Sequence, residues 1–352
     1  MLQRRVSFFI FRFADILSRM PLISAKNLVK EYKTYDRREG LGGAFLDLFH
    51  REYKTLRAVN DISFDIERGE MVGYIGANGA GKSTTIKMLC GVLYPTSGSI
   101  VIDGRVPVQD REAHVRNIGA VFGQRSQLWW DLAAGESLRL LGRIYGVEKT
   151  EFTARMAEFE DVLKLKDFLK TPARKLSLGQ KMRCELAASL IHNPKIVFLD
   201  EPTIGLDVAV KQSIREFVKR INTERGVTVI LTTHDLRDIE ELCSRVFIID
   251  KGKQVFDGTL DKLREKATDF AQLTFALARE FKKDWAPDGL PCTGVEWKAK
   301  GASLTAILSK EAPPRTDVIR AVLDKFGHEV EDIQIAEPGI EHIVSKIYEG
   351  KD

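Results

Sequence analysis

The sequence predicts an α/β fold with a mostly parallel sheet, an inserted helical subdomain and a small α+β domain at the C-terminal end. Strand-like and helix-like segments alternate between residues 195 and 250, which is typical of parallel sheets covered by helices. A glycine-rich loop at 76–83 stands between an apolar run and a helical run. Apolar residues at helical spacing fill residues 131–170, which indicates helices inserted into the α/β core.

The composition is that of a globular chain with room for one large domain and one small one. The chain has 352 residues, of which 44% are hydrophobic and 30% charged. Its formal net charge is +4, and the first twenty residues contribute four Arg against one Asp, so we expect no nucleic-acid-binding surface. No run of about 18 apolar residues predicts a membrane-spanning helix. The four cysteines form no C-x-x-C pair, so neither a zinc site nor a disulfide framework is predicted.

The first segment, residues 1–20, has an apolar stripe at helical spacing flanked by arginines. Two interpretations stay open. The segment forms an amphipathic helix on an anionic membrane surface, or translation begins at Met20 and residues 1–19 are absent from the protein.

The large domain is predicted over residues 21–264. It opens with a strand-like segment at 22–32, and apolar residues from Leu41 to Leu56 then recur at helical spacing, which predicts an inserted amphipathic helix over about 41–56. Residues 57–75 alternate between apolar and polar, as strands do.

The loop at 76–83 has the spacing of a phosphate-binding loop. It follows an apolar run at 70–75 and precedes a helical run that includes Thr84. Glycines let the backbone wrap around phosphate, Lys82 reaches the β- and γ-phosphates, and the Ser83 hydroxyl is placed for Mg²⁺. The residues here that we expect to bind the nucleotide are Gly76, Ala77, Asn78, Gly79, Ala80, Gly81, Lys82, Ser83 and Thr84.

Later elements complete the predicted core. Within the large domain we expect a helical subdomain over about 125–190, and then four elements at 195–199 (strand), 208–224 (helix), 227–232 (strand) and 245–250 (strand). Residues 265–352 form the small α+β domain, with strands at 273–276 and 303–308 and helices at 318–326 and 340–348.

Two carboxylates end the apolar strand at 195–199. Asp200 is expected to hold Mg²⁺, directly or through water, at the carboxyl edge of the sheet. Glu201 is then placed to orient and deprotonate the attacking water.

The segment Leu176-Ser177-Leu178-Gly179-Gln180 precedes these acids. With them and the phosphate loop, it resembles the signature of the ATP-binding subunit of an ATP-binding-cassette (ABC) transporter. The resemblance implies a P-loop NTPase of the ABC ATPase type, with a mixed sheet core. It also implies that Ser177, Gly179 and Gln180 contact ATP. Leu178 stands where the family has a glycine, a departure that bears on how tightly the signature packs on the γ-phosphate.

Further residues match the family in order. Gln124 resembles the glutamine that touches the metal and senses the membrane partner. Asp207, in Gly205-Leu206-Asp207, resembles the loop that crosses the dimer, and His234 resembles the switch histidine at the γ-phosphate. Tyr32 resembles the aromatic residue that stacks on adenine, and Tyr35 is close enough to compete for that role.

The resemblance implies ATP and Mg²⁺ as cofactors and a homodimer that sandwiches ATP. Residues 123–131 and the signature resemble a subgroup of exporters that pairs with separately encoded permeases of the ABC-2 type, at the cytoplasmic face of the inner membrane. Exporters of drugs or viologens are similar to this subgroup. A polysaccharide or lipid-linked glycan exporter is the alternative, and a soluble ABC ATPase unrelated to transport is a remote one. Trp129 and Trp130 either dock a permease helix or pack the helical subdomain.

Overall fold

The computed structural model describes residues 20–35, 53–123, 125–233, 235–265, 271–281, 285–309, 311–336 and 340–349. The chain divides into two compact units, residues 1–258 and 259–352. The predicted segment 1–19, the predicted helix from 41 to 52, Gln124 and His234 lie outside the described residues.

The first unit contains a three-stranded antiparallel sheet in the order β2-β1-β4. Its strands are β1 (Ile23–Tyr35), β2 (Tyr53–Ile66) and β4 (Ser97–Ile102). The strand predicted at 22–32 is therefore confirmed. Residues 53–56, which helical spacing had placed in the inserted helix, are instead strand, because they pair with the end of β1 from Tyr35↔Tyr53 to Tyr32↔Leu56. Cross-strand pairing decides the structure where short apolar periodicity is ambiguous.

A second sheet carries the phosphate loop. Its order is β5-β6-β7-β3-β8-β9, and the four pairs from β5 to β8 are parallel. The mostly parallel sheet is thus confirmed, and the mixed α/β fold of an ABC ATPase is the observed fold. The strands are β3 (Met71–Gly76), β5 (Ile118–Phe122), β6 (Ile196–Asp200), β7 (Thr228–Thr232), β8 (Arg245–Asp250) and β9 (Lys253–Thr259).

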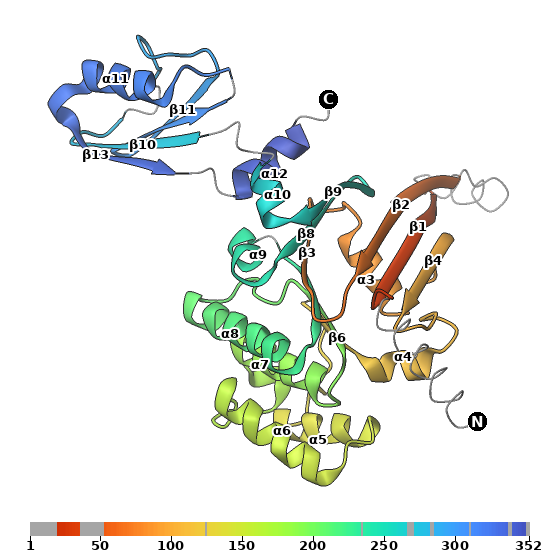
Figure 1. Cartoon of the computed structure of the whole chain (residues 1–352). Helices are drawn as coiled ribbons and strands as arrows, with labels where there is room; N and C mark the ends of the chain where they lie inside the picture. The colour runs from red at the N-terminus through yellow and green to blue at the C-terminus, as the bar shows by residue number, and fades with distance from the viewer. Residues whose placement is uncertain are drawn as a thin grey trace, which may run out of the picture. The chain divides into compact units, whose positions relative to one another are not determined.

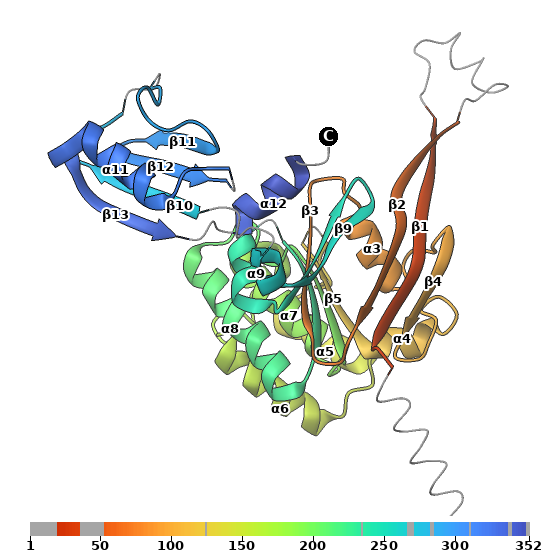
Figure 2. The same cartoon turned by 45° about the horizontal axis from the view of Figure 1, so that its top comes forward.

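Helix α3 (Lys82–Leu89) lies between the two sheets in both views (Figure 1, Figure 2). Its buried Ile86, Met88 and Leu89 belong to one hydrophobic core with residues of both sheets, such as Ile62 and Phe198. Burial of this apolar surface is the main favourable contribution to folding, and it fixes the start of α3 at the edge of the parallel sheet.

The remaining helices of this unit include the predicted helical subdomain, whose helices α5 and α6 lie together in Figure 1. Helix α8 begins at the N-cap Asp207 and ends at Gly226, which has a left-handed φ of 64°, a common helix stop. Among the described residues, every helix is too short or too polar to cross a membrane. The helices are α4 (Arg111–Asn117), α5 (Ala134–Ile144), α6 (Lys149–Val162), η1 (Ala173–Lys175), α7 (Leu178–Leu190), α8 (Val208–Arg225) and α9 (Leu236–Leu242).

The second unit has an antiparallel sheet in the order β11-β12-β10-β13. Buried residues of α11, including Val318 and Val322, share a hydrophobic core with Phe275 and Leu304 of the sheet. The elements are α10 (Leu260–Glu265), β10 (Ala271–Leu277), β11 (Val295–Lys300), β12 (Ser303–Leu308), α11 (Arg315–Phe326), η2 (Gly327–Glu329), β13 (Val330–Ala336) and α12 (Ile340–Glu349). The four elements predicted here are present.

Candidate functional site

A groove of about 920 Å³ opens at the carboxyl edge of the parallel sheet. Strands β3, β6 and β7 are parallel neighbours and end at that edge, where Asp200 and Tyr74 are each in register with Thr232. The groove is lined by Tyr32, Leu56, Ala58, Ala77, Asn78, Gly79, Gly81, Lys82, Ser83, Thr84, Lys87, Val92, Phe122, Gly123, Arg125, Asp200, Glu201 and Ile204.

The phosphate loop depends on a glycine at position 81. Gly81 has a φ of 107°, and a Cβ there would lie 2.3 Å from the carbonyl oxygen of Ala58. Only glycine tolerates both the conformation and the close approach. The loop is also held from behind, because the Gly252 N–H donates to the Ala80 carbonyl over 3.1 Å.

Lys82 lies inside the loop with only 6% of its surface exposed. Its Nζ donates to the carbonyl oxygens of Gly76 at 2.6 Å and Ala77 at 3.2 Å. Burial lowers the pKa of Lys82, and the negative charges of Glu201 and Asp200 partly offset that effect. The ammonium group therefore lies in the field of both acids at the point where phosphate is expected.

Asp200 joins the start of α3 to the end of β7. The Ser83 hydroxyl donates to its Oδ2 over 3.1 Å, and the Thr232 hydroxyl donates to its Oδ1 over 2.5 Å. Hydroxyl and carboxylate oxygens are the donors that Mg²⁺ prefers, and Mg²⁺ commonly takes one or two carboxylates together with phosphates. The oxygens of Ser83 and Asp200 therefore fit a magnesium site.

Glu201 follows Asp200 in a left-handed conformation, with φ 55°. Such a conformation is uncommon for a residue other than glycine and is found frequently at functional sites. Its N–H donates to the Thr232 carbonyl over 2.9 Å, which fixes the backbone at the sheet edge while the residue lines the groove.

The segment that contains Gln124 is attached to the same strand end. The Gly123 N–H donates to the Asp200 carbonyl over 3.0 Å, and a Cβ on Gly123 would lie 3.1 Å from that oxygen. Gly123 and Arg125 line the groove on either side of Gln124. Gln124 itself lies outside the described residues, so its expected role stays a prediction.

Tyr32, the predicted adenine-stacking residue, lines the groove together with Leu56 and Val92. The Lys30 ammonium lies 5.4 Å from the centre of its ring. The side chain of Tyr35 is outside the described part, so the choice between the two tyrosines stays a prediction.

The signature residues lie at the start of α7 and do not line the groove. Ser177 is the N-cap, and it forms a capping box with Gln180 through contacts of 3.2 and 3.0 Å. Gly179 approaches α8, since a Cβ there would lie 3.3 Å from Val210. Leu178 is 49% exposed, and a Cβ on Gly205 would meet its Cδ2 at 3.2 Å.

Asp207 is also outside the groove lining, and it stands two residues after Gly205, which approaches Leu178 of the signature. Its carboxylate caps α8 by accepting the Val210 N–H over 2.9 Å. Within one chain, Ser177, Gly179, Gln180 and Asp207 thus form a second surface, separate from the phosphate loop.

Helix α7 contains a buried carboxylate that sequence patterns did not single out. This carboxylate connects the helix to residues 126 and 127. Glu185 of α7 is 3% exposed and accepts hydrogen bonds from the Ser126 hydroxyl and the Gln127 N–H. Burial raises the pKa of Glu185, although these hydrogen bonds oppose the shift. Thr232 at Asp200 was likewise missed. An acid inside an apolar helix and a threonine at the end of an apolar strand are the signals that the sequence offers for them.

A glycine-rich loop between strand and helix, facing an acidic pair at the end of a parallel strand, defines a P-loop NTPase. The sequence profile of the family described as "ABC transporter" matches residues 59–204. The chain is 34% identical over 217 residues to the ABC transporter ATP-binding protein NatA of Bacillus subtilis (strain 168), covering 62% of this chain and 88% of NatA. It is 30% identical over 298 residues to the daunorubicin resistance ATP-binding protein DrrA3 of Streptomyces coeruleorubidus, covering 85% and 93%.

Longer proteins match as well. The chain spans 38% of the probable multidrug ABC transporter ATP-binding protein YbhF of Escherichia coli (strain K12), at 35% identity over 224 residues. Its fold matches a dimeric structure of the ATP-binding cassette MJ0796 in a post-hydrolysis state bound to ADP and Pi, with a TM-score of 0.57, 27% identity and coverage of 68% of this chain and 98% of that one. The chain therefore belongs to the ABC transporter family, as an ATP-binding subunit that hydrolyses ATP for transport.

Proposed function

We propose that the chain forms a homodimer around two ATP molecules and drives separately encoded permease subunits of an ABC-2-type exporter, from the cytoplasmic face of the inner membrane. The observation that supports the dimer is the division of the site. The phosphate loop, Asp200 and Glu201 line the groove, whereas Ser177, Gly179 and Gln180 lie on another surface of the same chain. A second subunit supplies the missing half.

The exposed side chains near the signature suit such an interface. Leu178, Ile204 and Val208 are 49%, 52% and 84% exposed, and the N-terminus of α7 offers partial positive charge to the γ-phosphate of a partner. An MJ0796 cassette is dimeric in its solved structures. ATP bound between the two halves favours the closed pair, and hydrolysis removes that preference.

Within each site, the residues divide the chemistry. Lys82 and the loop N–H groups bind the phosphates. Ser83, Asp200 and Gln124 would hold Mg²⁺, which would supply positive charge to neutralise the phosphoryl oxygens. Glu201 orients and deprotonates water, and His234 contacts the γ-phosphate. Tyr32 stacks on adenine, and Asp207 belongs to the loop that meets the partner.

Glu201→Gln tests this assignment. The variant keeps the shape of the side chain but loses its basicity, and general-base catalysis contributes on the order of 10²–10⁴-fold. We expect an ATP-bound dimer by light scattering and ATP turnover reduced at least about 100-fold. Glu112→Gln, at an exposed pair on α4, is the matched control and should behave as wild type. A Glu201→Gln protein that stays monomeric with ATP and Mg²⁺, or turns over normally, contradicts the proposal.

The exporter assignment is supported by similar proteins, which include a daunorubicin resistance ATP-binding protein and a probable multidrug ABC transporter ATP-binding protein. The tandem tryptophans suit a docking role, because Trp130 is 63% exposed and Trp129 is 38% exposed. We propose that they bind a cytoplasmic helix of the permease, since aromatic residues anchor interfaces.

Co-expression with a neighbouring permease of about six spans tests this docking. Trp130→Ala should keep the ATPase rate of the isolated protein and lose co-purification with the permease. Tyr94→Ala removes an aromatic residue of similar exposure, 64%, and this control variant should still co-purify with the permease. Normal permease retention by the Trp129→Ala/Trp130→Ala double variant rules out the docking role, and absence of any permease partner removes the exporter assignment.

A further inference from the structure

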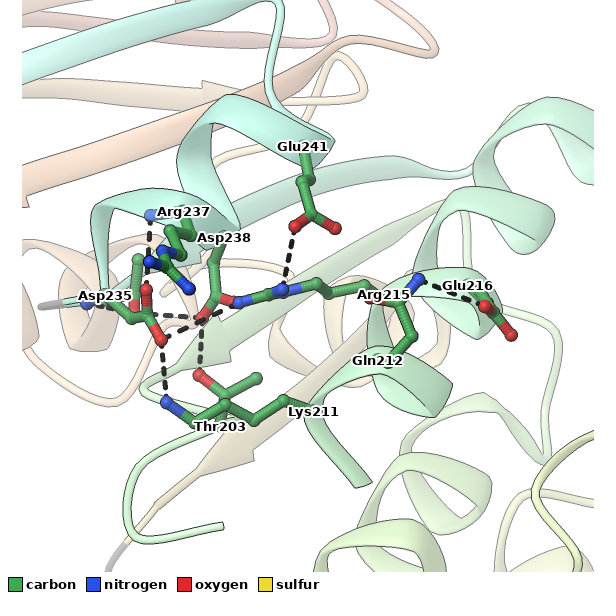
Figure 3. A network of polar contacts seen from close by, with 10 residues as sticks. Thr203, Lys211, Gln212, Arg215, Glu216, Asp235, Arg237, Asp238 and Glu241 are labelled. Atoms are coloured by element: carbon green, nitrogen blue, oxygen red, sulfur yellow. Dashed lines mark hydrogen bonds and ion pairs between the residues drawn. The ribbon is translucent and has the colours of Figure 1, made fainter. Parts of the chain in front are cut away.

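A buried ion pair joins helices α8 and α9 beyond the groove (Figure 3). The Nε of Arg215 donates to Oδ1 of Asp238 over 2.6 Å. Asp238 is fully buried and Arg215 is 9% exposed. Neither residue lines the groove. A buried carboxylate is costly unless it is paired and hydrogen-bonded, and removal of one partner is then strongly destabilising.

The other carboxylate oxygen of Asp238 accepts hydrogen bonds from two hydroxyl groups, which belong to separate segments. Both Thr203 and Thr233 donate to Oδ2, the latter over 3.2 Å. Thr203 comes two residues after Glu201, and Thr233 directly precedes His234. One carboxylate therefore ties the strand end that holds the proposed base to the segment that holds the switch histidine.

The chain on the other side of His234 is held by the same helix, α8. Asp235 accepts from Lys211 Nζ over 2.7 Å, and Arg215 Nη2 lies 3.7 Å from it. The Asp235 N–H donates to the Thr233 hydroxyl over 2.9 Å. Lys211 and Arg215 stand four and eight residues after Asp207, so both flanks of His234 are attached to the helix that starts at the dimer-facing loop.

We propose that Arg215 and Asp238 are positioning residues for ATP hydrolysis, which hold the Glu201 strand end and the His234 segment in register with α8. The inference rests on the proposed roles of Glu201 and His234. Since α8 begins at the surface expected to meet the partner subunit, the pair transmits closure of the dimer to the two catalytic segments. Arg215 and Asp238 do not line the nucleotide groove, so nucleotide binding should not depend on them. Hydrolysis should depend on them, because they hold the two catalytic segments.

Steady-state kinetics and binding of a fluorescent ATP analogue test this separation. Arg215→Met and Asp238→Asn should lower kcat at least about tenfold, with the nucleotide Kd within about twofold of wild type. Arg215→Lys keeps the charge but loses the planar fork, and it should recover part of kcat. Thr233→Val removes a single hydroxyl and provides a milder variant if the Arg215 and Asp238 variants fail to fold.

Two controls separate positioning from stability. Glu241→Gln removes the exposed partner of Arg215 Nη1, at 2.8 Å, and should leave kcat unchanged because Glu241 does not contact the switch segment. Arg245→Met breaks the double contact of Arg245 with Asp257, at 2.7 and 2.8 Å, and should lower Tm without lowering kcat.

The outcomes distinguish this inference from the proposed function. If Glu201→Gln abolishes turnover while folded Arg215→Met and Asp238→Asn retain wild-type kcat, only the positioning role is overturned. A parallel loss of kcat and nucleotide affinity also overturns it, since that result indicates a general structural role. If Arg215→Met and Asp238→Asn do not fold, an unchanged kcat in Thr233→Val overturns the positioning role. Normal turnover by Glu201→Gln overturns the proposed function itself.

Discussion

His192 is a single residue whose environment makes stability depend on pH. Its ring stacks on Tyr145 at a centroid distance of 3.9 Å, and Nε2 contacts the Ile118 carbonyl at 2.8 Å. Within the described part of the chain, Nδ1 is buried without a hydrogen-bond partner. Burial lowers the pKa of His192 to about 4, because a proton on Nδ1 would be buried unpaired.

We predict that His192 weakens the fold in acid. A pKa held below its unfolded value stabilises the folded state fully above about pH 6.5, and the contribution is lost as pH falls toward 4. Between pH 7.5 and pH 5 the loss is about 2 kcal/mol. Urea unfolding should show His192→Gln losing less stability than wild type over this interval. Equal losses in the two proteins contradict the assigned pKa.

Single residues also show where sequence inference succeeds. Lys82, Ser83, Asp200 and Glu201 were predictable because short spacings fix loop and strand-end chemistry, and the structure places all four at one groove. The contact of Asp200 with Thr232 spans 32 residues, and that of Arg215 with Asp238 spans 23. Such partners depend on which strands and helices become neighbours, which residue patterns do not specify.

At the scale of elements, the signature is the first turn of helix α7. Ser177 has two tasks, because its hydroxyl caps α7 and is proposed to contact the ATP of a partner subunit. Leu178 leaves the cap intact, since the capping box uses only Ser177 and Gln180. The departure from the family pattern therefore falls on an exposed side chain rather than on the helix start.

Substitutions of Ser177 should separate capping from binding. Loss of a serine cap to alanine costs about 1 kcal/mol, whereas glycine costs a few tenths. We expect Ser177→Gly to keep a thermal stability close to that of wild type yet to lose ATP-driven dimerisation. Ser177→Ala should lose both stability and dimerisation, and Ser177→Thr should keep both. Thermal unfolding and light scattering with ATP are the measurements. Normal ATP-driven dimerisation of Ser177→Gly would show that the hydroxyl acts only as a cap.

Elements were predictable where their periodicity is long or their apolar run is continuous. All five residues of β7 are buried, as expected for a strand with both faces covered. Strand β4 was not predicted, because its burial pattern begins with three exposed residues and its structure depends on pairing with β1. The same pairing partner gave residues 53–56 their strand structure.

At the scale of the whole molecule, the chain consists of two units with separate cores. The core between the sheets of the first unit and the core around Phe275 and Val322 of the second share no residue. Each unit also has its own sheets. Since cooperativity follows shared buried contacts, proteins of this kind depart from two-state unfolding.

We therefore predict two unfolding transitions that respond to different perturbations. The groove expected to bind nucleotide is lined by residues of the first unit, so a ligand at 100 times its Kd should stabilise that transition by about 2.7 kcal/mol and leave the other in place. Val322→Ala, at a fully buried position of α11, should destabilise the second unit by roughly 1–3 kcal/mol, with ATP turnover retained. Differential scanning calorimetry with and without ADP measures both shifts. A single transition that moves as a whole under either perturbation would show that the two units fold as one.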